Sequence, residues 1–214
     1  MICVTGEVGR KGHRFFAFGY SILSRLGEPV LGKHRRRLLA DGQGKVVELG
    51  SGTGRSFRYY TSAVEGVVAT EPDPHMLKRL RRSAPRAPVP VEVVDAVAES
   101  LPIEDSSADT VVAMLMLCSV EDPASSLAEA RRVLKPGGRL LFFEHVRSSD
   151  PKLAAKQDKK EKSWGKKAGG CRPNRGTEAS IRAAGFEITE IDHFAVPGSR
   201  LTRPHVLGVA RKPA

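Results

Sequence analysis

The sequence has few cysteines, few aromatic residues and no long hydrophobic run. Its cysteines, Cys3, Cys118 and Cys171, are widely spaced, which excludes a CxxC metal motif and an even-numbered disulfide framework. The longest apolar run, residues 111–118, suits one buried strand and is shorter than the ~18 residues of a membrane-spanning helix. Residues 1–12 lack the apolar core and cleavage site of a secretory signal. We therefore expect a cytoplasmic protein with reduced thiols.

Composition favours one folded domain with a basic surface. The 214 residues are 40% hydrophobic and 28% charged, which is enough apolar material for a core. Lys and Arg number 35 against 24 Asp and Glu, a formal net charge of +11. This excess permits attraction to nucleic acid, anionic lipid or an acidic ligand without selecting one. The basic residues 35–37 and 152–167 are equally consistent with solvated faces, and aromatic residues are only 6%, so no stacking platform for RNA is visible.

Seven short apolar segments alternate with helical patterns along the chain. This alternation predicts βαβ units around a mainly parallel sheet. The expected strands are residues 45–49, 67–70, 91–94, 110–117, 139–144, 186–191 and 205–210. The expected helices are residues 15–26, 29–39, 55–62, 74–83, 123–134 and 177–184.

Two segments flank or interrupt this pattern. Residues 1–40 contain two helical patterns that are too short for a domain of their own, so we expect a helical lid on a domain of residues 41–214. Residues 147–175 are polar and Lys-rich, and we expect either a mobile loop or a cover over the substrate.

A glycine-rich turn follows the first expected strand. The strand runs through Glu48 into Gly50, Gly52 and Gly54, which occupy alternate positions. Glycine allows a sharp turn and lets a ligand lie against bare backbone, and a helix N-terminus beyond it would offer free N–H groups. The third glycine of a dinucleotide fingerprint would stand at Arg55, and no GK[ST] follows, so this is neither that fingerprint nor a Walker loop.

Acidic residues end the next two expected strands. Glu71 follows the second strand, where a carboxylate can accept hydrogen bonds from both hydroxyls of a ribose. Asp95, followed by Ala96, ends the third strand, where it can accept from an exocyclic amine of adenine. These loops all lie at strand carboxyl ends, where ligands bind in open α/β sheets. Each carboxylate could also be an ordinary turn or surface residue.

Four segments resemble, in order, the motifs of class I S-adenosylmethionine-dependent methyltransferases with a methyltransferase type 11 domain. They are Glu48–Gly54, Glu71-Pro72-Asp73, Asp95-Ala96 with Leu101-Pro102, and residues 132–138. Residues 117–120, 144–146, 170–175 and 203–206 further resemble a methyltransferase-like group that includes membrane-associated thiol methyltransferases. The resemblance implies a Rossmann-like, seven-stranded, mostly parallel α/β sheet with helices on both faces and an antiparallel last strand.

The resemblance also implies that S-adenosyl-L-methionine is the cofactor and which residues contact it. The glycine turn would line its methionine part, with Glu48 at the amino group, and Glu71 would bind the ribose. Asp95 would contact the adenine edge, and Tyr20 would fold over the cofactor. The implied contact residues are Tyr20, Glu48, Gly50, Ser51, Gly52, Gly54, Glu71, Pro72, Met76, Asp95, Ala96, Leu117 and Cys118.

Methyl transfer from a sulfonium makes modest demands on the protein, because the methyl group is already activated and in-line positioning supplies much of the rate. A base is needed only for a protonated acceptor, and His145 and His205 are the candidates, although each could be structural. We expect Cys118 to be a small core residue, Cys171 to be unreactive, and no metal site.

The expected function is methyl transfer to a small, hydrophobic acceptor, such as a thiol, a quinone-like ring or a lipid headgroup. An RNA methyltransferase that uses the basic surface and a non-catalytic cofactor-binding protein are the alternatives. Peripheral membrane contact and the oligomeric state stay open.

Overall fold

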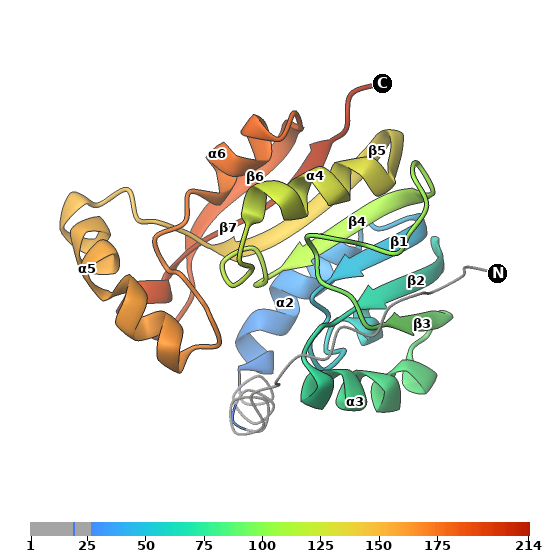
Figure 1. Cartoon of the computed structure of the whole chain (residues 1–214), viewed down its shortest axis with the longest axis horizontal. Helices are drawn as coiled ribbons and strands as arrows, with labels where there is room; N and C mark the ends of the chain where they lie inside the picture. The colour runs from blue at the N-terminus through green and yellow to red at the C-terminus, as the bar shows by residue number, and fades with distance from the viewer. Residues whose placement is uncertain (1–18, 20–26) are drawn as a thin grey trace.

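The structure, a computed structural model, describes residue 19 and residues 27–214. Tyr20 and the helix expected over residues 15–26 lie outside the described residues, apart from Gly19. A seven-stranded sheet runs through the molecule in the order β3-β2-β1-β4-β5-β7-β6 (Figure 1). The strands are β1 Gly44–Leu49, β2 Val64–Thr70, β3 Val91–Val94, β4 Ala108–Met114, β5 Leu134–His145, β6 Glu187–Ala195 and β7 Pro204–Arg211.

The sheet is parallel except for its last strand. The β1 strand pairs in parallel with β2 and β4, and β4 pairs in parallel with β5. The β7 strand is inserted antiparallel between β5 and β6. This arrangement confirms the fold class expected from the sequence.

Helices cover both faces of the sheet. They are α2 Glu28–Leu39, α3 Pro74–Ser83, α4 Pro123–Val133, α5 Pro151–Lys167 and α6 Thr177–Ala183, with 3-10 turns η1 Phe57–Tyr59, η2 Ala84–Arg86 and η3 Arg200–Thr202. One core packs α4 and α6 against the sheet, and a second packs α2, η1 and α3 against the opposite face (Figure 1). None of the described helices is both apolar and long enough to span a bilayer.

The central strands are apolar throughout because they have a core on each side. In β4, Val111 and Ala113 belong to one core and Val112 to the other. In β5, Phe142 and Phe143 likewise point to opposite cores, and neither is exposed.

The segment after β1 differs from the expected helix over residues 55–62. It forms only the short 3-10 turn η1, after which Tyr60 returns to extended backbone. The hydroxyls of Ser56 and Tyr60 both donate to the buried Glu48 carboxylate, and these bonds draw the chain inward before a helix can form. The free N–H groups of a helix N-terminus, expected beside the glycines, are therefore replaced by turn backbone.

The fourth strand ends at Met114 and not at residue 117. Leu115 has a left-handed φ of 55°, which breaks the strand. The N–H groups of Met116 and Leu117 then donate to the side-chain carboxylate of Glu144 and not to strand backbone.

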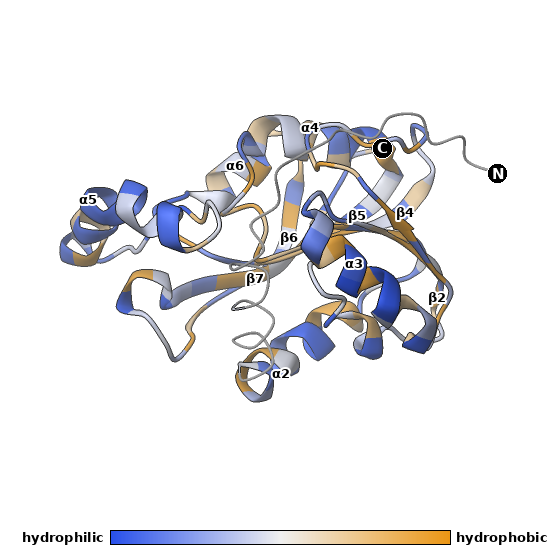
Figure 2. Ribbon diagram, turned by 60° about the horizontal axis from the view of Figure 1, so that its bottom comes forward, coloured by the Kyte–Doolittle hydropathy of each residue, from blue (hydrophilic) through white to orange (hydrophobic). Residues whose placement is uncertain are grey.

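The Lys-rich segment expected as a loop forms helix α5. Asp150 caps it by accepting from the Lys152 N–H, and Pro151 takes the first helical position. The sequence pattern did not predict this helix, because only Ala154 and Gln157 are buried and the helix therefore has no apolar stripe. Figure 2 shows α5 as a largely hydrophilic ribbon at one end of the molecule.

Helix α2, which lies in the segment expected to form a lid, packs against the sheet, and the division into a lid and a main domain stays a prediction. Its Leu38 and Leu39 are fully buried in the core that also contains Phe143 and Leu207. The remainder of residues 1–40, apart from Gly19, lies outside the described residues.

Candidate active site

The glycine turn after β1 places bare backbone at the carboxyl edge of the sheet. Gly50, Gly52 and Gly54 have φ values of 59°, 58° and 75°, a region that side chains disfavour. A Cβ atom at Gly50 would lie 3.0 Å from the Met116 Cβ atom. At Gly54 it would overlap the Phe57 ring, so this glycine is required for packing.

Glu48 binds the segment that follows the glycine turn. It is buried, and its two carboxylate oxygens accept from the hydroxyls of Ser56 and Tyr60, each at 2.6 Å. Burial raises the pKa of Glu48, and the two hydroxyl bonds oppose this shift. A carboxylate has further lone pairs, so the expected contact with the cofactor's amino group stays a prediction.

Glu71 joins the glycine turn to the loop after β2. Its carboxylate oxygens accept from the backbone N–H groups of Gly52 at 2.8 Å and Asp73 at 2.9 Å. Burial raises the pKa of Glu71 to about 7, although both backbone bonds favour the ionised form. The negative charges of Asp73 and Asp95 raise the pKa further.

Helix α3 connects the loop after β2 with the glycine turn. Asp73 caps the helix by accepting from the N–H groups of His75 and Met76, which leaves the Met76 side chain buried. At the other end, the Ser83 hydroxyl donates to the Thr53 carbonyl at 3.0 Å. Ala96 is also buried, whereas Pro72 and Asp95 are half-buried.

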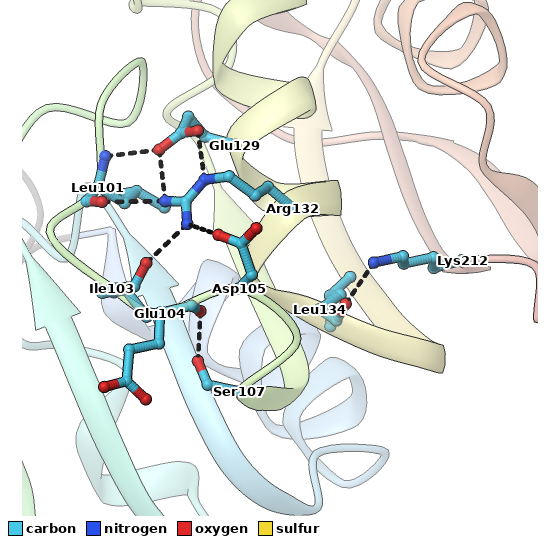
Figure 3. Close-up of polar contacts among 9 residues, drawn as sticks. All are labelled: Leu101, Ile103, Glu104, Asp105, Ser107, Glu129, Arg132, Leu134 and Lys212. Atoms are coloured by element: carbon cyan, nitrogen blue, oxygen red, sulfur yellow. Dashed lines mark hydrogen bonds and ion pairs between the residues drawn. The ribbon is translucent and has the colours of Figure 1, made fainter.

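Arg132 fixes the loop that follows Asp95 and Ala96 (Figure 3). Its guanidinium donates to the Glu129 carboxylate and to the Asp105 carboxylate. It also donates to the Leu101 and Ile103 carbonyls, while Glu129 accepts from the Leu101 N–H. All five guanidinium donors are therefore used, and none of these roles was assigned from the sequence.

Glu144 fixes the loop after β4. It is fully buried at the end of β5 and accepts from three successive backbone N–H groups, those of Met116, Leu117 and Cys118. Burial raises the pKa of Glu144, and these bonds oppose the shift. Sequence reasoning assigned it no role, although a carboxylate ending an apolar strand was a visible signal.

The segment between α5 and α6 closes over the same loop. The Arg175 guanidinium donates to the carbonyls of Leu117 and Val120, both at 2.5 Å. The Arg172 N–H donates to the Cys118 carbonyl at 2.8 Å. Gln157 is fully buried, and the two N–H groups of its amide lie within hydrogen-bond distance of three carbonyls, which anchors α5.

The two candidate bases have different surroundings. His145 and His205 face each other across β5 and β7, with ring centroids 6.0 Å apart. The Nδ1 atom of His205 lies 3.0 Å from the Arg203 carbonyl, and burial lowers the pKa of His205 to about 4. The Nε2 atom of His145 lies 3.1 Å from the Cys171 sulfur.

The expected contact residues thus form one connected edge. Gly52 meets Glu71, Gly50 approaches Met116, and the loop carrying Leu117 and Cys118 is bound to Glu144. Leu117 and Cys118 are both buried. Tyr20 lies outside the described residues, so its expected position over the cofactor stays a prediction.

Comparisons with known proteins bear on this edge. Residues 47–142 match a family described as a methyltransferase domain. Rat thiol S-methyltransferase TMT1B is 36% identical over 172 residues, which cover 78% of this chain and 70% of the relative. Human thiol S-methyltransferase TMT1A is 33% identical over 176 residues, which cover 80% and 72%.

The chain belongs to the class I S-adenosylmethionine-dependent methyltransferases. A solved S-adenosylmethionine-dependent methyltransferase from Thermotoga maritima has the same fold, with 24% identity, a TM-score of 0.68, and coverage of 94% of this chain and all of the other. The enzyme class and the cofactor expected from the sequence are therefore confirmed.

The residues present fit this cofactor. Gly52 carries no side chain at its left-handed position, and Glu71, which accepts from the Gly52 N–H, lies beside it with further lone pairs. The methyltransferase also has a second group of reactive side chains, Cys118, His145 and Cys171, which lie close together.

Proposed function

We propose that this methyltransferase transfers the methyl group of S-adenosylmethionine to the sulfur of a small, hydrophobic thiol. The observation that carries the proposal is the extent of the similarity to two thiol S-methyltransferases. It spans 172 and 176 residues, well beyond residues 47–142 of the methyltransferase domain. Similarity that extends beyond the methyltransferase domain favours a shared acceptor class, because function depends on the residues of the site and not on the fold alone.

We also propose how the chain binds the donor. The backbone of Gly50, Ser51 and Gly52 would contact its methionine part, and Glu71 would accept from the ribose hydroxyls through its remaining lone pairs. Asp95 would accept from the adenine amine. Met76, Pro72, Ala96 and Leu117 would line the adjacent walls.

When bound, the donor supplies a methyl group that its positively charged sulfur has already activated. The chain has to bind, orient and deprotonate the acceptor. A thiol has a pKa of about 8.5, so it needs only modest help to ionise near neutral pH. His205 would be a weak base, because burial lowers its pKa to about 4. His145 is the other candidate, and its Nε2 atom lies 3.1 Å from the Cys171 sulfur.

The RNA alternative would use the basic surface of α5. Asp158 and Glu161 on this helix pair with Arg147 and Arg172, which neutralises part of its surroundings. Methyl transfer to a quinone-like ring or to a lipid headgroup would use the same donor site as transfer to a thiol, so these alternatives differ only in the acceptor.

A tritiated-methyl transfer screen tests the proposal. Purified full-length chain is incubated with labelled donor and, separately, with alkyl and aryl thiols, phenolic quinol precursors, phospholipid vesicles and total RNA. We expect label in the thiols, with faster transfer to the more apolar ones. Label only in a phenol, a lipid or RNA would overturn the proposal. Salt-sensitive RNA labelling would identify a phosphate-contacting enzyme.

A further inference from the structure

Three chemically soft side chains meet where β4 and β5 end. Cys118 follows β4, His145 ends β5, and Cys171 lies in the loop after α5. One ligand atom from each, two sulfurs and an imidazole nitrogen, lies within 4.8 Å of the other two. All three residues are buried, and the two cysteines are free thiols. This is the one such group of metal-ligating side chains in the described part of the chain.

The donor set and its spacing suit zinc. Zinc prefers sulfur and nitrogen ligands in tetrahedral geometry, at ~2.3 Å and ~2.0–2.1 Å, so neighbouring ligand atoms lie about 3.5–3.8 Å apart. The Cys171 sulfur and the His145 Nε2 atom are already 3.1 Å apart, and the widest spacing in the group is within 4.8 Å. Shifts of about an ångström in side-chain positions would bring all three to a shared ion.

The contacts of His145 and Cys171 leave both side chains available to a ligand. His145 is 6% exposed, and the contact of its Nε2 atom with the Cys171 sulfur is the one hydrogen bond of this ring among the described residues, since its Nδ1 atom has no partner there. In addition, the Trp164 indole N–H donates to the Cys171 sulfur at 3.1 Å, the kind of outer contact that orients a metal-bound thiolate.

The backbone around the group is fixed independently of a metal. Glu144 accepts from the Cys118 N–H, and the Arg172 N–H donates to the Cys118 carbonyl. Gln157 anchors α5, which carries Trp164. Two thiolates neutralise a divalent ion, so the site is neutral before the acceptor binds, and a bound acceptor thiolate adds one negative charge that methylation to a thioether removes.

We propose that Cys118, His145 and Cys171 bind Zn²⁺ and that the fourth coordination position binds the thiolate of the acceptor. Three protein ligands with one open position are typical of catalytic zinc sites. Coordination deprotonates a thiol outright, so Zn²⁺ binding releases the protons of Cys118 and Cys171 to solvent, and binding R–SH as R–S⁻ releases one more. His145 is then a ligand and not a base, and the Met116–Cys118 loop connects the zinc to the glycine turn at Gly50. The thiolate part of this proposal rests on the proposed function.

Metal content tests the zinc site without any methyl transfer. The full chain is purified under reducing conditions without chelator, reconstituted with Zn²⁺, and assayed by mass spectrometry of the metal and by competition with a chromophoric chelator. We expect one zinc per chain and at least ~100-fold weaker binding in Cys118→Ser, Cys171→Ser and His145→Gln. Cys3→Ser is the matched control and should bind normally. Absence of stoichiometric zinc, or equal loss in Cys3→Ser, would overturn the site.

Cobalt substitution tests the open position. A Co²⁺-loaded chain should show thiolate charge-transfer bands, and titration with 2-mercaptoethanol should shift its d–d bands, whereas 2-methoxyethanol should not. Unchanged bands would overturn the thiolate position. If zinc-free chain methylates thiols at the full rate, the thiolate position on zinc fails while the proposed function stands. If zinc and thiol bind but no thiol is methylated, the proposed function fails while the zinc site stands.

Discussion

The two halves of the sheet's carboxyl edge are held together over different distances in the sequence. Over β1 and β2, Glu48 binds Ser56 and Tyr60, 8 and 12 residues away, and Glu71 binds Gly52, 19 residues away. Over β4 and β5, Glu144 binds Cys118 across 26 residues. Arg175 binds Leu117 across 58 residues.

This difference explains why the half over β1 and β2 was recognisable from the sequence and the half over β4 and β5 was not. The donor-side half is a compact motif whose residue types and spacing are all visible in one stretch of sequence. The acceptor-side half takes single residues from β4, β5, α5 and the loop before α6, and each looks ordinary in its own surroundings. The comparison can be tested by substitutions that damage one half and leave the other intact.

The largest effect is expected from Gly52→Val in the donor-side half. Valine would have to adopt a φ of 58°, which costs about 1–2 kcal/mol or more, and it would place a branched side chain on the backbone that we propose contacts the donor. We expect donor affinity to fall by at least ~1000-fold, about 4 kcal/mol, in calorimetric titration. Circular dichroism should show an intact fold.

Gly137→Val is the matched control for this substitution. Gly137 also has a left-handed φ, 74°, but a Cβ atom there would meet nothing within 4 Å. It should lose a similar amount of stability and bind the donor normally. Normal donor binding by Gly52→Val would show that the turn does not receive the cofactor.

The next effect is expected from Glu144→Leu in the acceptor-side half. Leucine leaves three buried N–H groups without their acceptor, so we expect the free energy of unfolding to fall by about 3 kcal/mol or more. Urea denaturation measures this loss, and Glu144→Gln, which keeps one acceptor oxygen, should lose less. Equal stability of Glu144→Leu and the unmodified chain would contradict the structural role assigned to this carboxylate.

Glu71 should make donor binding pH-dependent. Burial raises the pKa of Glu71 to about 7, and ribose hydroxyls donate best to the ionised form. Donor affinity should therefore rise as the pH increases through about 7 and then level off. Glu71→Gln should flatten this profile and weaken binding by about 10–100-fold. A pH profile that persists in Glu71→Gln would assign the titration to another group.

The same carboxyl affects stability in the opposite direction. Its folded pKa, about 7, lies above the ordinary value of 4.5, so the folded chain holds the proton more tightly. This contribution to stability is fully present below pH 4.5 and is lost as the pH rises to about 7. Urea unfolding of the unmodified chain and Glu71→Gln across this interval isolates the contribution.

The smallest effects are expected at the loop after β3 (Figure 3). Arg132→Ala removes contacts to Glu129, Asp105 and two carbonyls, and we expect about 1–2 kcal/mol of lost stability. The donor KM should rise a few-fold because the loop supports the adenine side.

Glu104→Ala is the control on the same loop. Its side chain is exposed, and Figure 3 shows the carboxylate pointing away from the Arg132 network. It should change stability by less than about 0.5 kcal/mol and leave the donor KM unchanged. If both variants behave alike, the network does not position the loop.

Local signals in the sequence predicted most of the fold. The strand over residues 91–94 and the helix over residues 74–83 have the expected bounds, because Asp73 and Pro74 mark a helix start and the apolar run has strand length. The prediction of a helix over residues 55–62 was wrong. The hydroxyls of Ser56 and Tyr60 donate to Glu48, and a pattern within residues 55–62 does not include that partner.

The sequence by itself determined the alternation of strands and helices, the glycine turn and the carboxylates beside it, because these depend on residue spacing within short segments. Only the tertiary structure decided which distant side chains share a site. Cys118, His145 and Cys171 converge because β4 and β5 are parallel neighbours that end at the same edge and α5, anchored by Gln157, returns the chain to it. The hydrophobic periodicity of a segment does not predict this proximity, since it depends on how distant segments pack together and not on the order of residues within each.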